Sequence, residues 1–299
     1  MTIRFNCPNC DALIAFYDRH AGKRARCLTC GQILIIPDQS GKIPQKVKTK
    51  PEITEPLSGF YSAVFIDSFE VFFDRQNLTP LVFIAAVVSF KFFLSTVMCL
   101  GFISYVVIWG FLLGFYLNII YETAFDIDTL PQIDLGENIT FLWQIIKPFL
   151  IFFFTMFIVQ LPFIIALMIL KNKGITYENM WQAHTGLHLL LQFLFIFALF
   201  LFPMAVLTLA VGQDVTLLRP DCLITPILKA PLSYLIVFFL LVAACVLEMH
   251  AKQFSGLSGE TFFTAAPKLV LNLFVQVLAV IAMRSIGLFY RHYSCYLRW

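Results

Sequence analysis

Four cysteines near the start of the chain form the pattern best suited to chemistry. Two C-x2-C pairs, Cys7-Pro-Asn-Cys10 and Cys27-Leu-Thr-Cys30, are separated by sixteen residues. This spacing fits the C-x2-C-x15–20-C-x2-C pattern of zinc sites. A two-residue gap lets a tight turn direct two thiolates at one ion, and two such turns complete a tetrahedral shell of sulfurs. We therefore predict a Zn2+ ion bound by Cys7, Cys10, Cys27 and Cys30.

The ligand set indicates what kind of site this is. A shell of four thiolates leaves no open position for a substrate, so a structural role is favoured over a catalytic one. Iron is the alternative metal, because the same shell suits a rubredoxin-like electron carrier. The chain shows no nucleophile triad, Gly-rich phosphate loop or zinc-protease motif. We therefore expect no enzyme, and no catalytic or further cofactor-binding residues.

Short strands must position the two cysteine pairs. Ile3 and Phe5 precede the first pair, and residues 33–36 follow the second, which predicts a zinc ribbon over residues 1–37. About forty residues cannot bury a sufficient core without a metal. Four basic residues lie between the pairs and would offset the charge of the metal centre: Arg19, Lys23, Arg24 and Arg26. Nucleic-acid binding is the alternative role for these residues, and we do not expect it.

The composition of the whole chain indicates a membrane protein. Of 299 residues, 60% are hydrophobic and 13% charged, and the mean hydropathy is +0.83. Soluble domains carry about 25% charged residues, so this chain has too few to cover a surface facing water. Helices of about 20 apolar residues cross a bilayer. We predict an all-α polytopic membrane bundle with a small N-terminal zinc ribbon. The bundle has about six such spans: 80–100, 102–123, 148–170, 187–211, 231–250 and 266–289.

Two further segments lie between the ribbon and the transmembrane domain, which we place at 80–299. Residues 38–57 are rich in Pro, Lys and Thr without an apolar period, which predicts a flexible basic linker. Its lysines at 42–50 would touch anionic lipid or remain solvated. Residues 58–76 show a wide apolar stripe at helical spacing beside Asp67, Glu70 and Asp74. We expect an amphipathic helix, lying in the membrane interface or packed on the bundle.

Glycine and proline divide the apolar region. The first two spans come from one run, and Gly101 is the expected turn between them. Pro148 and Pro231 fall where a helix tolerates proline, in its first turn. Pro162 and Pro203 fall inside spans and should bend them.

The positive charges predict the orientation. With the N-terminus inside, sixteen of the 21 Lys and Arg residues fall in cytoplasmic segments and four fall outside. This bias agrees with the positive-inside rule, so we expect both termini in the cytoplasm. Lys91 is the remaining charge and lies deep in a span. We predict that it contacts Gln160, Gln276 or a backbone carbonyl, with a lysine that reaches the headgroups as the alternative.

Two weaker patterns lie in the spans. Gly110-x-x-x-Gly114 is a small-residue motif that allows close helix packing. Three histidines and a glutamate fall near the outer ends of the fourth and fifth spans: His184, His188, His250 and Glu248. Interfacial polar residues are the default interpretation, and a metal or proton site is the alternative.

The N-terminal residues also resemble a known kind of ribbon. Ile3-Arg4-Phe5-x-Cys7-Pro8-x-Cys10, Ala21-Gly22-Lys23-x-Ala25-Arg26-Cys27-x-x-Cys30-Gly31 and Leu34-x-Ile36-Pro37 are similar to the N-terminal zinc ribbons of planctomycete-type bacterial proteins. Leu28 stands where such ribbons usually have proline.

The membrane region resembles the DUF4013-like integral membrane proteins, a family without a settled activity. The segments that carry this resemblance are Gly114-Phe115-Tyr116 through Leu130-Pro131-x-x-Asp134, Phe202-Pro203-Met204-Ala205 and Gly287-Leu288-Phe289-Tyr290-Arg291-x-Tyr293. The resemblance implies a multi-pass protein of a bacterial inner membrane.

These patterns together predict a non-catalytic membrane protein. We expect the cytoplasmic ribbon to dock a membrane or cytoplasmic protein while the bundle anchors or assembles a complex. A small-solute transporter or channel with a regulatory ribbon is one alternative, and iron-based electron transfer is another. A transporter should show several intramembrane charges on broken helices, whereas this chain has one deep charge and two interior prolines.

Overall fold

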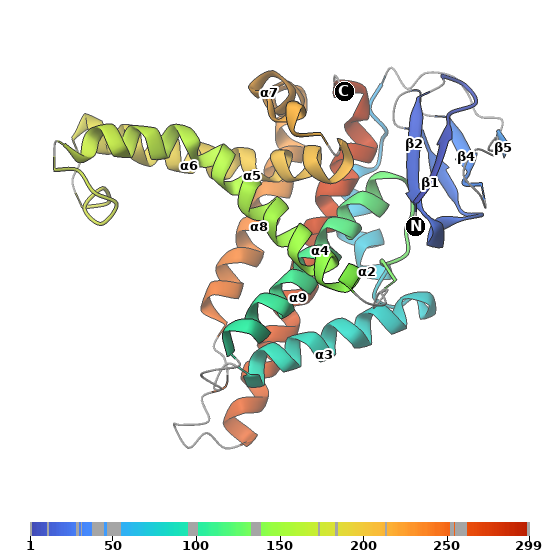
Figure 1. The fold of residues 1–299 in the computed structure, drawn as a ribbon, viewed down its shortest axis with the longest axis horizontal. Coiled ribbons are helices and arrows are strands. Elements are labelled where there is room, and N and C mark those ends of the chain that lie inside the picture. The colour runs from blue at the N-terminus through green and yellow to red at the C-terminus, as the bar shows by residue number, and fades with distance from the viewer. Residues whose placement is uncertain are drawn as a thin grey trace.

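The computed structural model describes most of the chain. It covers residues 2–10, 12–27, 30, 32–37, 45–46, 55–94, 101–132, 139–172, 174–182, 185–212, 214–251, 254 and 262–297. These residues form a helical bundle with a small β module beside it, and both ends of the chain lie on the side of that module (Figure 1).

The β module consists of two hairpins. Strand β1 (Thr2–Asn6) pairs antiparallel with β2 (Leu13–Tyr17), and β3 (Arg24–Arg26) pairs antiparallel with β4 (Ile33–Ile35). Each hairpin carries one cysteine pair beyond its first strand. A two-residue strand, β5 (Gln45–Lys46), adds to β4. This short strand falls inside the predicted linker, whose residues 38–44 and 47–54 lie outside the described part.

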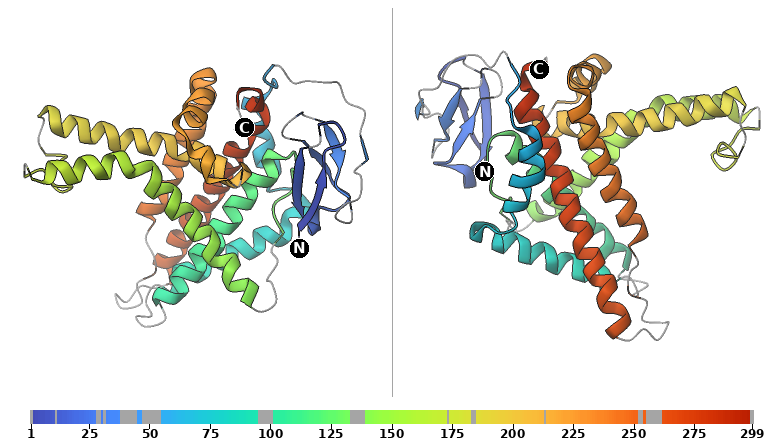
Figure 2. Two further views of the ribbon diagram at one scale, coloured as in Figure 1. Left: turned by 45° about the horizontal axis from the view of Figure 1, so that its top comes forward. Right: turned by 180° about the vertical axis from the view of Figure 1, so that it is seen from behind.

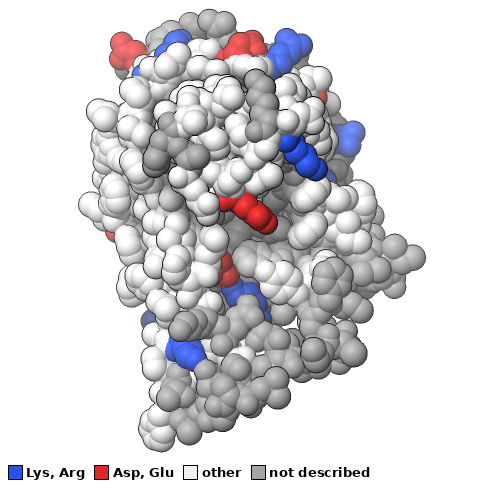
Figure 3. All heavy atoms as spheres, turned by 90° about the vertical axis from the view of Figure 1, so that its left-hand side faces the viewer, with Lys and Arg blue, Asp and Glu red and all other residues white. Residues whose placement is uncertain are grey.

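Six long helices confirm the predicted polytopic all-α architecture. Each is long and apolar enough to cross a membrane, and the visible face of the protein is mostly uncharged (Figure 3). The helices are α3 (Leu78–Leu94), α4 (Gly101–Ala124), α5 (Ile139–Lys171), α6 (Gly186–Leu207), α8 (Pro231–His250) and α9 (Phe262–Tyr293). A shorter helix, α7 (Pro220–Lys229), connects α6 to α8.

Helix α9 is the centre of the bundle. It packs along α4 and α8, and 61% of its most apolar stretch is buried inside the protein. Gly287 permits the close approach to α4, because a Cβ atom there would lie 2.7 Å from the carbonyl oxygen of Ile120. The long C-terminal helix therefore reaches the ends of several other helices, including those next to the β module (Figure 2).

Helices α5 and α6 form a hairpin that projects from the rest of the bundle (Figure 1). Its outer part has a small core of its own, formed by Phe163, Leu170, Ile175, Met180 and Leu191. Helix α5 is bent along its length (Figure 2), and both Pro148 and Pro162 lie inside it. The prediction that Pro148 opens this helix is wrong, because α5 begins nine residues earlier at Ile139.

Other predicted breaks agree with the structure. Helix α4 begins at Gly101, the predicted turn, and Pro231 occupies the first turn of α8. Pro203 lies inside α6, and a π-helical turn over Thr208–Gly212 follows that helix.

The amphipathic segment before the first span is helical. It contains α1 (Phe60–Ser62), a π-helical turn (Ala63–Asp67) and α2 (Ser68–Glu70). One side packs on α9, where the Phe60 ring lies 6.4 Å from that of Phe289. The other side leaves large apolar side chains exposed: Phe65, Ile66, Phe69 and Phe73. The segment thus combines the packing of a bundle helix with the exposed apolar face of an interfacial one.

Candidate metal centre

The two hairpins bring the four cysteines of the predicted site together. One sulfur atom from each of Cys7, Cys10, Cys27 and Cys30 lies within 4.8 Å of the others. The Sγ atoms of Cys7 and Cys30 are 3.6 Å apart, and those of Cys10 and Cys27 are 3.7 Å apart. All four are free thiols. Among the described residues, this is the group of metal-ligating side chains gathered closely enough to hold an ion.

The sulfur separations suit a tetrahedral ion. Four Zn–S bonds of about 2.3 Å in a tetrahedron place the sulfurs about 3.8 Å apart, close to the two distances above. Each knuckle is closed by a backbone hydrogen bond: the Cys7 N–H donates to the Ala12 carbonyl and the Cys27 N–H to the Gln32 carbonyl, at 2.9 and 2.8 Å. The cluster is therefore able to hold a metal such as zinc, and four protein ligands would fill the coordination shell.

The two sides of the cluster differ in their surroundings. Cys7 and Cys27 are buried, whereas Cys10 is exposed. Partial desolvation within the cluster raises the pKa of the Cys10 thiol, although the residue as a whole is exposed. Burial also raises that of Cys30, but hydrogen bonds from the Gln32 backbone, Asn9 and neighbouring thiols outweigh it and lower the pKa to about 7. A thiol with this pKa is about half ionised at neutral pH, and the thiolate is the form that binds metal.

Aromatic side chains attach the ribbon to the bundle. Phe16 on β2 is 1% exposed, and its ring meets that of Phe125 edge-on at a centroid distance of 4.9 Å. The Tyr121 ring lies 6.2 Å from the same Phe16 ring, and the Tyr121 hydroxyl donates to the Ala15 carbonyl. The ribbon thus shares one hydrophobic core with the end of α4.

Polar contacts strengthen the same interface. The His20 Nε2 atom lies 3.2 Å from a carboxylate oxygen of Glu122, and both side chains are 2% exposed. The Lys23 ammonium donates to the Thr129 hydroxyl at 3.4 Å. The ribbon is therefore seated on the bundle, which the sequence analysis did not predict. Two of the basic residues between the cysteine pairs also face the bundle: Lys23 contacts Thr129, and Arg26 lines a cleft beside α9.

A second polar cluster lies inside the transmembrane bundle. Lys91 of α3 is 3% exposed and pairs with Glu248 of α8. The Gln276 amide of α9 donates to the other Glu248 oxygen at 3.2 Å and accepts from the Tyr116 hydroxyl of α4. The Lys91 ammonium also lies 5.1 Å from the centre of the Trp109 ring, a cation–π contact.

This cluster corrects the prediction for Lys91. The side chain is buried, but its partner is Glu248, and Gln276 reaches it through that carboxylate. Gln160 lies apart, and both of its amide atoms are buried without a hydrogen-bond partner in the described chain. Glu248 falls near histidines in the sequence, and nothing in the local pattern indicates that Lys91, 157 residues away, would reach it.

The histidines expected near Glu248 do not join it. His188 contacts the Thr185 hydroxyl, and the His250 Nδ1–H donates to the Val246 carbonyl of its own helix at 2.8 Å. His184 lies outside the described residues. The glycine motif does allow close packing, because a Cβ atom on Gly110 would lie 2.7 Å from the Ile145 carbonyl oxygen. Gly114 lines a groove between helices.

Comparison with known proteins gives no match to any family model, curated protein or solved structure. The resemblance to ribbon-bearing bacterial membrane proteins therefore assigns no family. What stands is a multi-pass membrane architecture with a cluster of four cysteines on two small hairpins.

Proposed function

We propose that this chain is a non-catalytic membrane protein whose zinc-stabilised ribbon recruits a membrane or cytoplasmic protein while the bundle anchors the assembly. The seating of the ribbon on α4 is the observation that supports this proposal most directly. It fixes one face of the ribbon through Phe16, His20 and Lys23. A rigidly held module presents its remaining surface at small entropic cost to binding.

The free face of the ribbon carries a suitable contact. Leu13 on β2 is 70% exposed, on a strand whose Phe16 is buried against the bundle. The closed shell of four thiolates favours a structural role over a catalytic one. We propose zinc as the metal, with iron as the alternative because it suits the same shell.

Site-specific photo-crosslinking in native membranes tests this function. A photoreactive residue at position 13 should capture one defined protein, and the Cys27→Ser variant should lose that product because its ribbon is unfolded. The matched control places the same residue at Tyr177, which is also exposed but lies beyond α5. Equal capture at both positions, or capture that survives metal loss, would contradict a recruiting ribbon.

We further propose that the N- and C-termini face the cytoplasm of a bacterial inner membrane. The distribution of Lys and Arg supports this orientation, and a reducing cytoplasm would keep the thiols able to bind metal. Single cysteines introduced at Tyr177 and near residue 254 should react with an impermeant maleimide added outside the cell. A cysteine at Thr129 should not, and labelling there from outside would reverse the proposed topology.

A transporter or channel is the second candidate, and the buried polar cluster is the observation that favours it. An intramembrane ion pair on separate helices is typical of proton and ion pathways. Proteoliposomes with an internal pH dye test this role. Flux that Glu248→Gln abolishes, in a protein that remains folded, would establish transport; a leak no greater than that of empty vesicles would favour the recruiting role.

A further inference from the structure

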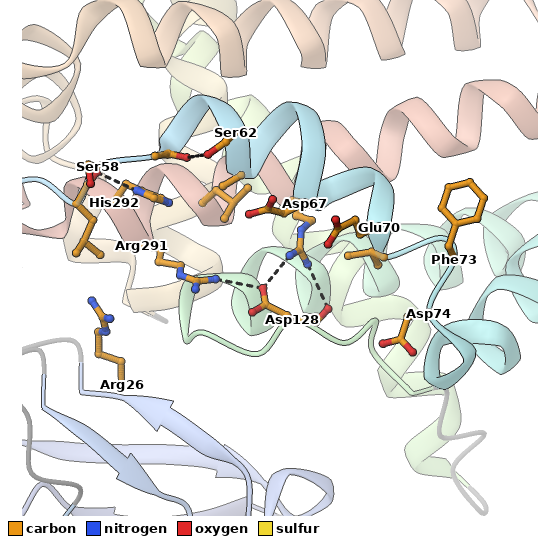
Figure 4. A pocket seen from close by; sticks show the side chains of 16 residues that line it. Arg26, Ser58, Ser62, Asp67, Glu70, Phe73, Asp74, Asp128, Arg291 and His292 are labelled. Carbon is orange, nitrogen blue, oxygen red and sulfur yellow. Dashed lines mark hydrogen bonds and ion pairs between the residues drawn. The ribbon is translucent and has the colours of Figure 1, made fainter.

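A polar cleft lies where the ribbon, the amphipathic segment and α9 meet. Its volume is about 880 Å3, within the range of small-molecule sites. Figure 4 shows Arg26 entering from the ribbon, while Asp67 and Glu70 come from the opposite helical segment. Three arginines and four carboxylates line the cleft: Arg26, Arg284, Arg291, Asp67, Glu70, Asp74 and Asp128.

Two of the three arginines already have carboxylate partners. The Arg284 guanidinium donates to an Asp128 oxygen at 2.8 Å, and Arg291 donates to the same oxygen at 3.1 Å. Arg291 also pairs with Asp126. These ion pairs hold Arg284 and Arg291 in place and balance the charge of Asp128. Arg26 is therefore the arginine in the cleft that remains available to a ligand.

Arg26 has unmet hydrogen-bonding capacity. Its Nε and Nη1 atoms are buried and have no hydrogen-bond partner in the described part of the chain. A buried donor without a partner destabilises the protein, and more so when it is charged, so a ligand that accepts from it is favoured. On the opposite wall, the exposed carboxylates of Asp67 and Glu70 have no hydrogen-bond or ion-pair partner within the described part of the chain, although the Asp67 charge acts on Arg284. The cleft therefore offers a cation with two unpartnered donor atoms on one side and solvent-exposed carboxylates on the other.

The charges select the class of ligand. With four carboxylates against three arginines, the cleft is negative by one charge, which disfavours a simple anion. A simple cation would leave Arg26 without a partner. A molecule with a phosphate at one end and a protonated amine at the other satisfies both walls, because arginine binds phosphate well and carboxylates accept from ammonium groups.

The position of the cleft indicates where such a molecule comes from. Asp128 follows the end of α4, Arg291 lies in the last turn of α9, and Asp74 precedes α3. The cleft is thus level with the ends of three spanning helices, where headgroups lie. At its rim Phe73 is 86% exposed, as expected for an aromatic side chain at the membrane interface.

We propose that this cleft binds the headgroup of a zwitterionic aminophospholipid, with Arg26 donating to the phosphate and Asp67 and Glu70 accepting from the amine. The lipid would bridge the ribbon and the amphipathic segment. This role is separate from partner recruitment and does not depend on it.

Native mass spectrometry of the delipidated full-length protein tests the site. We expect phosphatidylethanolamine to bind about tenfold more tightly than phosphatidylglycerol, the difference expected for a charged hydrogen bond. Equal binding of the two lipids would overturn the proposal. Soluble O-phosphoethanolamine is the third probe: binding of this compound without binding of the lipid would exclude a lipid ligand.

Variants on the two walls make the test independent of ribbon folding. Arg26→Gln should lower phosphatidylethanolamine binding about tenfold with the metal content unchanged, whereas Arg24→Gln, exposed on the same strand, should not. Asp67→Asn combined with Glu70→Gln should reverse the preference toward phosphatidylglycerol, because the cleft then becomes positive. Glu178→Gln on the projecting hairpin is the control. An unchanged lipid preference in the double variant would rule the site out.

Discussion

The chain holds charge away from water in two places, and it does so in different ways. The ribbon gathers four thiols from two neighbouring hairpins, a group that could bind a metal ion as thiolates. The bundle joins Lys91, Glu248 and Gln276 from three helices, so each charge is balanced by another part of the chain. We therefore expect the ribbon to depend on a bound ion for its fold, whereas the inner cluster depends on correct helix assembly.

Metal removal should separate the two regions most strongly. Structural zinc sites supply an apparent free energy of about 10–16 kcal/mol, which a ribbon of this size cannot replace. The unsubstituted protein should bind about one zinc ion per chain, and Cys27→Ser should bind none. In the variant, residues 2–37 should become sensitive to protease, while the helical circular dichroism signal is largely retained. Cys222→Ser in α7 is the matched control and should keep the metal. A red, reversibly reducible native protein would instead identify iron.

Breaking the inner pair should damage the bundle and spare the ribbon. Loss of one partner of a buried ion pair costs about 3–5 kcal/mol. Glu248→Leu should be worse than Lys91→Leu, because the lysine side chain left behind is 2% exposed while that of Glu248 is 20% exposed.

The double variant measures the pair itself. Lys91→Leu with Glu248→Leu should be more stable than Glu248→Leu alone in a detergent unfolding titration, because no uncompensated charge remains. Zinc content should be unchanged in all three proteins. Additive destabilisation would show that the two residues do not interact.

A substitution on α9 should disturb both regions together. Gly287→Ala places a Cβ atom 2.7 Å from the Ile120 carbonyl oxygen and 2.8 Å from the Cβ of Thr123. Overpacking of this kind costs about 1–3 kcal/mol, so it should lower the melting temperature of the bundle. It should also weaken the packing of the ribbon on α4, because α4 would have to shift. Gly186→Ala, with no atom within 4 Å of its added Cβ, should change neither.

The smallest effect is expected at the ribbon interface. Glu122→Gln keeps the shape of the side chain but removes its charge beside His20, so we expect a loss of about 1 kcal/mol. Hydrogen exchange of the ribbon amides should become faster while that of α8 does not. Faster exchange in α8 would mean that Glu122 supports the bundle rather than the seating of the ribbon.

The parts of this molecule that could be predicted from sequence are those encoded locally. Cys7 and Cys10 indicate a knuckle because the spacing alone determines the turn, and runs of apolar residues indicate spans because lipid requires them. The pairing of Lys91 with Glu248 spans 157 residues and leaves no periodic trace. The packing of the ribbon on the bundle also depends on residues far apart in sequence. The large side chains of Phe5 and Phe16 in so small a module are the signal that could have indicated a contact with the bundle.

The sequence distance between the paired charges has a consequence for synthesis. Arg284 is synthesised 156 residues after its partner Asp128, and Glu248 is synthesised 157 residues after its partner Lys91. At about 5–20 residues per second, each delay lasts roughly 8–30 s. During that time the early helices carry unpaired charges that the insertion machinery and proteases can detect. A ribosome that stops before α8 would therefore release a chain that lacks both Glu248 and Arg284, and we expect proteases to degrade it.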